Sequence, residues 1–133
     1  MVCLYCQGKT KVNNSRSSKK TLQIWRRRQC KSCGAIFTSL ERPDFFGSLI
    51  VERLSGQYEP FSADKLFISI YESCKHRADP LSDARALTNT ITANLLKTAR
   101  KGVLSRSDIT SIVNKILGRF DKSAKVYYLA YYE

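Results

Sequence analysis

The stretch Cys3-Leu4-Tyr5-Cys6, separated by 23 residues from Cys30-Lys31-Ser32-Cys33, decides how the first part of this chain folds. Two such pairs offer four thiolates to one tetrahedral Zn²⁺, which binds cysteine sulfur at about 2.3 Å. With four protein ligands, no position is left for a catalytic water. The sequence therefore predicts a structural zinc site formed by Cys3, Cys6, Cys30 and Cys33.

Two disulfides, or a redox-active pair, are the alternatives for these cysteines. Disulfides need an oxidising compartment, and residues 1–6 lack the charged and then apolar profile of an export signal. A redox pair is expected near a strand–helix–strand unit, rather than at the two ends of a basic loop. Zinc is the favoured interpretation, and we expect it to supply on the order of 10 kcal/mol of folding free energy to a segment without a core of its own.

The segment between and around the cysteine pairs is strongly basic. Residues 1–42 contain ten Lys or Arg and one acidic residue, a net charge of +9, whereas residues 43–133 carry only +3. This asymmetry points to a polyanion partner, since arginine matches phosphate oxygens and guanine edges. A solvated charge run is the alternative, but solubility does not require forty consecutive positions without an acidic residue. The residues predicted to contact nucleic acid are Lys11, Arg16, Arg26, Arg27, Arg28 and Lys31, and Trp25 beside them either stacks on a base or covers a small core.

The rest of the chain is predicted to combine a β-hairpin with three or four helices. Residues 43–47 are predicted as a linker, residues 48–54 as a strand, and residues 57–60 as a returning arm whose proline favours a sheet edge. Helix starts are predicted at Ser62, at Asp79, at Ser105 or Ser107, and near Asp121. Cys74 is expected to pack as a small apolar side chain, and His76 to lie at the surface. The predicted fold class is α+β.

These residues resemble the NrdR family of bacterial repressors of ribonucleotide reductase genes. The zinc ribbon of that family is similar to Thr10-Lys11-Val12-Asn13-Asn14-Ser15-Arg16, to Arg26-Arg27-Arg28-Gln29-Cys30-x-x-Cys33-Gly34 and to Phe37-Thr38-Ser39-Leu40-Glu41-Arg42. Its ATP-cone is similar to Val51-Glu52-Arg53-Leu54-Ser55-Gly56-Gln57-Tyr58-Glu59-Pro60-Phe61-Ser62-Ala63-Asp64-Lys65-Leu66. The resemblance implies a DNA-binding zinc ribbon at residues 1–42, a linker at 43–47, and an ATP-cone that binds ATP or dATP at 48–133.

In ATP-cones the first strand, the turn and the following helix start surround the nucleotide. The resemblance therefore implies nucleotide contacts at Val51, Arg53, Ser55, Gly56, Glu59, Ser62 and Lys65. A helix N-terminus also presents unpaired N–H groups to an anion, which suits phosphates at this place. The chain departs from the family pattern where Arg53 replaces a lysine, Leu54 a second basic residue, and Asn14 an aspartate.

The function predicted from these features is that of a nucleotide-responsive, zinc-dependent, DNA-binding transcriptional repressor. Its expected partners are a double-stranded operator of ribonucleotide reductase genes, ATP or dATP, and further copies of the chain, since relatives form homo-oligomers. The tyrosine-rich last helix is the expected contact surface between copies, or else part of the core. The alternative function is a zinc-ribbon nucleic-acid-binding protein whose second domain only mediates protein association.

Other classes of function find no support in the sequence. There is no nucleophile–base pair and no acidic metal cluster, so we do not expect an enzyme. No apolar run approaches the roughly 18 residues of a membrane-spanning helix, and we expect no membrane partner. Together with the absence of an export signal, this predicts a cytoplasmic protein.

Overall fold

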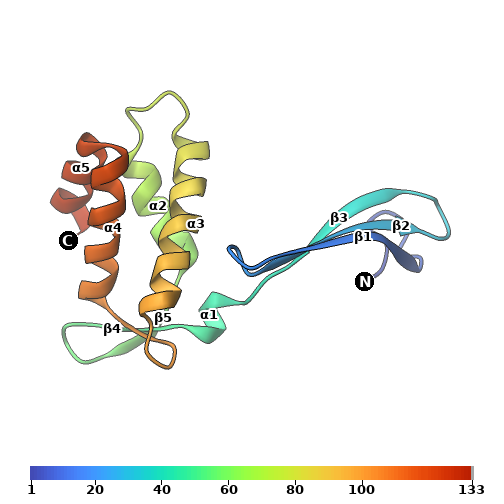
Figure 1. Cartoon of the computed structure of the whole chain (residues 1–133), viewed down its shortest axis with the longest axis horizontal. Helices are drawn as coiled ribbons and strands as arrows, with labels where there is room; N and C mark the ends of the chain where they lie inside the picture. Colours follow the sequence, from blue (N-terminus) through green and yellow to red (C-terminus); the bar gives the residue numbers. More distant parts are fainter. Residues whose placement is uncertain (133) are drawn as a thin grey trace. The chain divides into compact units, whose positions relative to one another are not determined.

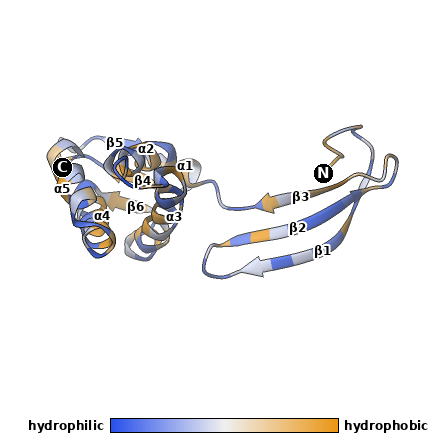
Figure 2. Ribbon diagram, turned by 90° about the horizontal axis from the view of Figure 1, so that it is seen from above, coloured by the Kyte–Doolittle hydropathy of each residue, from blue (hydrophilic) through white to orange (hydrophobic). Residues whose placement is uncertain are grey.

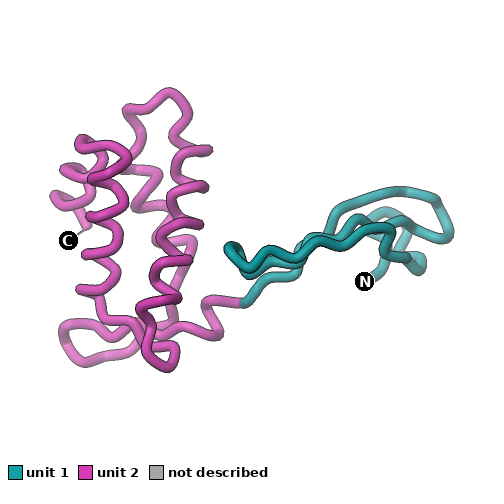
Figure 3. The backbone as a smooth tube through the Cα atoms, in the orientation of Figure 1, with its two compact units in different colours: residues 1–43 teal, residues 44–133 magenta. Residues whose placement is uncertain are grey.

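The computed structural model describes residues 1–132 and divides the chain into two compact units, residues 1–43 and 44–133 (Figure 3). Residues 43–47, predicted as a linker, overlap a short helix, α1 (Phe45–Ser48), that belongs to the second unit. The side chain of Asp44 caps this helix by accepting a hydrogen bond from the Phe46 N–H at 3.2 Å. No helix in the described residues is long and apolar enough to cross a membrane.

The first unit is a three-stranded antiparallel sheet with the strand order β1-β2-β3 (Figure 1). Strands β1 (Thr10–Ser18) and β2 (Gln23–Cys30) form a long hairpin, and β3 (Ile36–Glu41) pairs with the other edge of β2. Its cluster of buried side chains consists of Cys3, Cys30 and Phe37, with Ala35 packed against it. Such a small cluster cannot balance the entropy of ordering the unit, so a cross-link is required.

The second unit combines a small mixed sheet with four longer helices, and each of these helices carries both hydrophobic and hydrophilic residues (Figure 2). The sheet has the order β5-β4-β6, formed by β4 (Ile50–Glu52), β5 (Tyr58–Pro60) and β6 (Val103–Ser105). Strand β4 is antiparallel to β5 and parallel to β6. The helices are α2 (Ala63–Ser73), α3 (Pro80–Thr98), α4 (Arg106–Phe120) and α5 (Lys122–Tyr132). The predicted α+β fold class is thereby confirmed.

The predicted helix starts are confirmed because each rests on a local hydrogen bond. Ser62 accepts from the Lys65 N–H at 3.2 Å, and Asp79 accepts from the Ser82 N–H at 3.2 Å. At the start of α4, Ser105 and Asp108 each accept from the other's backbone N–H at 3.0 Å, which forms a capping box. These bonds satisfy backbone donors that the first turn of a helix leaves without partners.

Two expectations about the strands need correction. The strand expected at residues 48–54 is only three residues long, because the chain turns at residues 53–56, where Gly56 has a φ of +80°. Strand β6 was not predicted, since three residues are too few to show a period and its partner β4 lies some fifty positions earlier. The edge position expected for Pro60 is confirmed by the sheet order.

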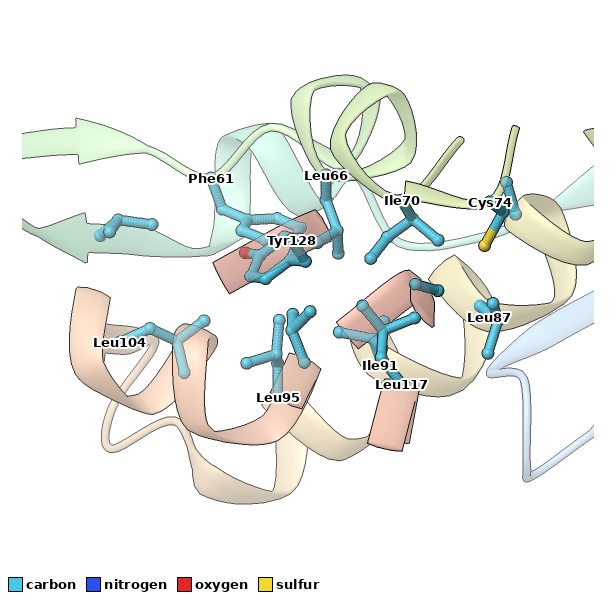
Figure 4. Close-up of a cluster of buried hydrophobic side chains, with 14 of the residues drawn as sticks. Phe61, Leu66, Ile70, Cys74, Leu87, Ile91, Leu95, Leu104, Leu117 and Tyr128 are labelled. Atoms are coloured by element: carbon cyan, nitrogen blue, oxygen red, sulfur yellow. The ribbon is translucent and has the colours of Figure 1, made fainter. Parts of the chain in front are cut away.

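The core of the second unit lies between the small sheet and the four helices (Figure 4). Ile70, Ile91, Leu95, Leu104 and Leu117 have no exposed surface. Cys74 is also completely buried in this core, as expected, and burial raises the pKa of its thiol. The contribution of Leu104 from β6 shows why the short strand matters: it closes the core at the end where the sheet lies.

A polar cluster joins the ends of four helices, α2 to α5. Asp121 accepts from Arg77 Nη1 at 2.9 Å and from the Ala124 N–H at 3.0 Å, and its Oδ2 lies 3.0 Å from His76 Nε2. Arg77 also donates to Asp83 at 2.6 Å and lies over the ring of Phe120 at 4.2 Å. The hydrogen bonds from His76, from the Ala124 N–H and from Arg77 hold the pKa of Asp121 well below its usual range. His76, expected at the surface, is half-exposed and takes part in this cluster.

Replacing Asp121 by Asn should lower the free energy of unfolding of the second unit by about 1–3 kcal/mol near neutral pH, because His76, Arg77 and the Ala124 N–H lose a charged acceptor. A lowered folded-state pKa adds stability above the unfolded-state value of about 3.9, and this contribution is lost as the pH falls below it. The difference between wild type and Asp121→Asn should therefore shrink below about pH 4. Urea unfolding followed by helical circular dichroism measures it. A loss as large for Glu52→Gln, which changes an exposed carboxylate of β4, would contradict the assignment.

Candidate functional site

The four predicted zinc ligands come together at one end of the first unit. Their sulfur atoms all lie within 4.8 Å of one another. Two contacts join one cysteine from each pair: Cys3 Sγ lies 3.7 Å from Cys33 Sγ, and Cys6 Sγ lies 3.4 Å from Cys30 Sγ. These distances are far beyond a disulfide bond of about 2.05 Å. Among the described residues all the cysteines are free, so the disulfide alternative is not supported.

The donor set and its spacing fit Zn²⁺. A tetrahedron with Zn–S bonds of about 2.3 Å has ligands about 3.8 Å apart, close to the Cys3–Cys33 and Cys6–Cys30 sulfur–sulfur distances. Backbone N–H groups of Cys33 and Ser32 donate to Cys30 Sγ at 3.4 and 3.3 Å, which lowers the pKa of this thiol to about 6. Zinc binds the thiolate, so these donors favour the ligating form. Bound there, the ion would cross-link the two pairs.

Glycine permits the close approach of the two cysteine turns. A β-carbon at Gly8 would lie 2.6 Å from the Ser32 hydroxyl oxygen and 3.2 Å from Cys6 Sγ. Gly34, directly after the second pair, has a φ of +74°, a backbone conformation that side chains rarely adopt. The backbone of the two turns is also joined, because the Lys31 N–H donates to the Lys9 carbonyl at 2.9 Å.

The basic residues predicted to bind nucleic acid lie mainly on β1 and β2, and their contacts differ. Arg26 Nη1 lies 2.7 Å from a carboxylate oxygen of Glu41, the one acidic residue of this unit. Arg28 donates to the Ser39 hydroxyl at 2.8 Å, and Arg27 donates to the Thr38 hydroxyl at 2.9 Å. Lys11 and Arg16 on β1 and Lys31 between the second pair of cysteines are exposed. The guanidinium carbon of Arg16 lies 6.0 Å from the ring centre of Trp25, which is half-buried.

The second unit contains a pocket of about 230 Å³ between the β-hairpin and helices α2, α4 and α5. Five of the seven residues predicted to contact a nucleotide line it: Val51, Arg53, Glu59, Ser62 and Lys65. Ser55 and Gly56 lie instead in the turn between β4 and β5, outside this lining. Leu54, where the family pattern has a basic residue, is 89% exposed and does not line the pocket.

Sequence reasoning missed the pocket residues that come from α4 and α5, namely Arg106, Ile109, Thr110, Tyr128 and Tyr132. Glu52 and Ser105 are partners at the ends of the parallel strands β4 and β6. The residues that follow them, Arg53 and Arg106, therefore lie next to each other, and this places Arg106 at the pocket. The parallel pairing was the only signal that could have found it, and three-residue strands do not reveal their pairing.

Removing zinc should unfold the first unit and leave the second intact, because only the first lacks a substantial apolar core. We expect one zinc ion per chain by metal analysis, and loss of the folded Trp25 fluorescence on chelation or in Cys30→Ser, while helical circular dichroism persists. Cys74→Ala is the matched control, since it removes a cysteine from the other core and should leave zinc content unchanged. Full zinc content in Cys30→Ser would refute the four-thiolate site.

Comparison with known proteins bears on both units. Residues 1–41 match the family model described as "Transcriptional repressor NrdR-like, N-terminal domain". A transcriptional repressor NrdR of Heliobacterium modesticaldum is 33% identical over 133 residues, which cover 99% of this chain and 86% of that protein. One of Bartonella henselae is 34% identical over 134 residues, 99% of this chain and 82% of that protein. One of Symbiobacterium thermophilum is 35% identical over 95 residues, and this match spans 71% of this chain and 63% of that protein.

The match to the family model covers the first unit and the relatives' matches cover both, and together they confirm the resemblance to the NrdR family. They also support the prediction that the chain is not an enzyme, since the relatives are named as transcriptional repressors. With about one residue in three identical over nearly its whole length, the chain belongs to the NrdR family of transcriptional repressors.

Proposed function

We propose that this protein is a zinc-dependent, DNA-binding transcriptional repressor that responds to ATP or dATP and acts on ribonucleotide reductase genes. The names of its relatives support repression, and the basic strands of the first unit support a DNA partner. The observation that carries the response to nucleotides is the cationic pocket of the second unit. The effector, the operator and self-association are all parts of this proposal.

The charge of the pocket suits a phosphorylated ligand. Three cationic side chains, Arg53, Lys65 and Arg106, line it together with one carboxylate, Glu59. Arg53 Nη2 lies 2.7 Å from Glu59 Oε2, and this contact, with the charges of the other two cations, lowers the pKa of Glu59. Helices α2 and α4 both begin at the pocket, and a helix N-terminus favours an anion. Phosphates would bind beside Arg53, Lys65 and Arg106, near the starts of α2 and α4.

The remaining lining of the pocket suits a base. Val51, Phe61 and Leu66 are buried apolar residues, and Tyr128 lies beside them. A volume of about 230 Å³ is below the roughly 300–1,000 Å³ of pockets that enclose a whole ligand. The base would therefore be enclosed, while the phosphates lie at the charged rim. Ligand sites commonly combine an apolar cavity with a few polar or charged groups that orient the ligand.

Calorimetric titration of the zinc-loaded chain with ATP, and separately with dATP, should give saturable binding. Lys65→Gln and Arg106→Gln should each weaken the affinity tenfold or more, because each removes a charged donor to phosphate. Arg85→Gln, which changes an exposed arginine of α3 outside the pocket, should bind as wild type does. An absence of binding by wild type would leave the alternative function, a nucleic-acid-binding protein whose second unit serves association only.

Helix α5 offers a physical link between the pocket and self-association. Tyr128 and Tyr132 stack at 5.5 Å between ring centres and line the pocket. Tyr127 and Tyr131, whose ring centres are 4.6 Å apart, are exposed, as is Val126. One helix thus contributes an inner pair of tyrosines to the pocket and an outer pair to the surface, so a ligand that shifts this helix moves both pairs. Binding can then favour one assembly over another.

Light scattering of the purified protein should give a mass that changes when ATP or dATP is added. The double variant Tyr131→Ser with Val126→Ser should abolish that change, because it removes exposed apolar area, and it should retain nucleotide binding by calorimetry. Leu81→Ser, on the exposed surface of α3, is the matched control. One unchanged mass under every condition would count against regulation by assembly while leaving nucleotide binding intact.

A further inference from the structure

The sheet of the first unit has two faces of different chemistry. Successive side chains of a strand point to opposite faces, and residues directly opposite on neighbouring strands share a face. The register pairs Lys11 with Gln29, Asn14 with Arg27, and Arg16 with Trp25, so all six lie on one face, here called the open face. Arg26, Arg28 and Cys30 alternate with them along β2 and lie on the other face, here called the metal face.

A bulge at Asn13 places both β1 cations on the open face. Lys11 and Arg16 are five positions apart, and in a regular strand an odd separation would put them on opposite faces. The register shifts between Val12 and Asn14, which leaves Asn13 without a partner. Bulges redirect side chains in this manner. As a result the partners of Lys11 and Arg16 on β2, Gln29 and Trp25, are four positions apart and share one face.

The cations of the two faces differ in exposure and in their partners. Lys11, Arg16 and Arg27 on the open face are exposed, although Arg27 donates to the Thr38 hydroxyl at 2.9 Å. On the metal face Arg26 is half-buried and paired with Glu41, the only acidic residue among residues 1–42, at 2.7 Å. Arg28, also half-buried, donates to Ser39 and lies opposite the buried Phe37 on β3. Positive charge is therefore partly offset on the metal face and left available on the open face.

The open face continues into a hollow beside the second cysteine pair. This hollow is open to solvent, has a volume of about 610 Å³, and is lined by Lys11, Gln29, Cys30, Lys31, Ser32, Cys33 and Gly34. Lys11 and Gln29 belong to the open face and Cys30 to the metal face, so the hollow lies at the end of the sheet where the second cysteine pair follows β2. The surface thus runs from the ligand-bearing turn along β1 and β2, with Lys31, Lys11, Arg27 and Arg16 along it.

We propose that the open face is the surface that contacts double-stranded DNA, and that Arg26 and Arg28 hold the sheet together from the metal face. This inference rests on the proposed DNA binding and selects, among the basic residues, those that make the contacts. Lys11, Arg16, Arg27 and Lys31 bind phosphates. Strands β1 and β2 carry three of these four cations and form an antiparallel pair that β3 flanks, and DNA-binding proteins can place β-strands in a groove of the duplex. The ring of Trp25 holds the Arg16 guanidinium over the open face.

The salt dependence of DNA binding distinguishes the two faces. Fluorescence anisotropy measures the binding of the zinc-loaded full chain to a labelled duplex of mixed sequence at several salt concentrations. In a plot of the logarithm of the association constant against the logarithm of the salt concentration, four phosphate contacts per ribbon should contribute about −3.6 to the slope. Arg16→Gln and Arg27→Gln should each reduce the magnitude of the slope by about 0.9. The matched variants Arg26→Gln and Arg28→Gln should leave the slope unchanged and lower the melting temperature of the first unit.

A second variant tests the face without changing net charge. Ser15→Arg combined with Arg16→Ser moves one guanidinium from the open face to the metal face, because Ser15 is the partner of Arg26. We expect the magnitude of the slope to decrease by about 0.9, as in Arg16→Gln. Zinc content and Trp25 fluorescence should match those of wild type.

The outcomes distinguish DNA binding itself from the assignment of that binding to the open face. A wild-type slope near zero would overturn DNA binding and with it this inference. A steep wild-type slope that is lost in Arg26→Gln and Arg28→Gln, but kept in Arg16→Gln and Arg27→Gln, would overturn the open face alone. Equal losses in all four variants, with no effect of the exchange at positions 15 and 16, would mean that net charge matters and the face does not.

Discussion

Four cysteine sulfurs gathered within 4.8 Å of one another are the constraint on which the first unit depends. Thiolates at this separation repel one another unless a cation lies between them, so the ligating form of the cluster requires the metal. Two of the three buried residues beneath the sheet, Cys3 and Cys30, are themselves ligands. Loss of zinc therefore removes the cross-link and most of the core together. Because β2 ends at Cys30, the metal also fixes the strand that carries three consecutive arginines.

The second unit is held by an ordinary apolar core, and its pocket is a consequence of topology. Strands β4 and β6 are parallel, so both point the same way and both are followed by residues at the same end of the sheet. Arg53 leaves one strand there, and Arg106 starts α4 after the other. Helix α2, which follows the antiparallel arm, adds Lys65. Three cations from separate segments of the chain thus line one pocket beside the three-stranded sheet.

Features that depend on local chemistry could be predicted from the sequence. The helix starts at Ser62 and Asp79 follow from side chains that bond to N–H groups three residues later, and the cysteine spacing indicates four ligands for one ion. Features that depend on distant pairing could not. Strand β6, and with it Arg106, is positioned by a partner some fifty residues earlier. The consecutive arginines Arg26 to Arg28 look like one patch in sequence, yet the alternation of β2 divides them between two faces.

The pocket and the basic strands belong to different compact units, and in the proposed function the coupling between them acts through association. Coupling free energies of about 1–3 kcal/mol suffice for a five- to 150-fold change in affinity, and reciprocity requires DNA to change nucleotide affinity equally. Helix α5 is a candidate for this coupling because it places tyrosines both at the pocket and at the surface. Tyr128 is buried and packs at the pocket, whereas Tyr131, three residues later, is 70% exposed. A ligand in the pocket would contact Tyr128 while Tyr131 stays at the surface, so this one helix adjoins both the proposed ligand and the proposed contact between copies.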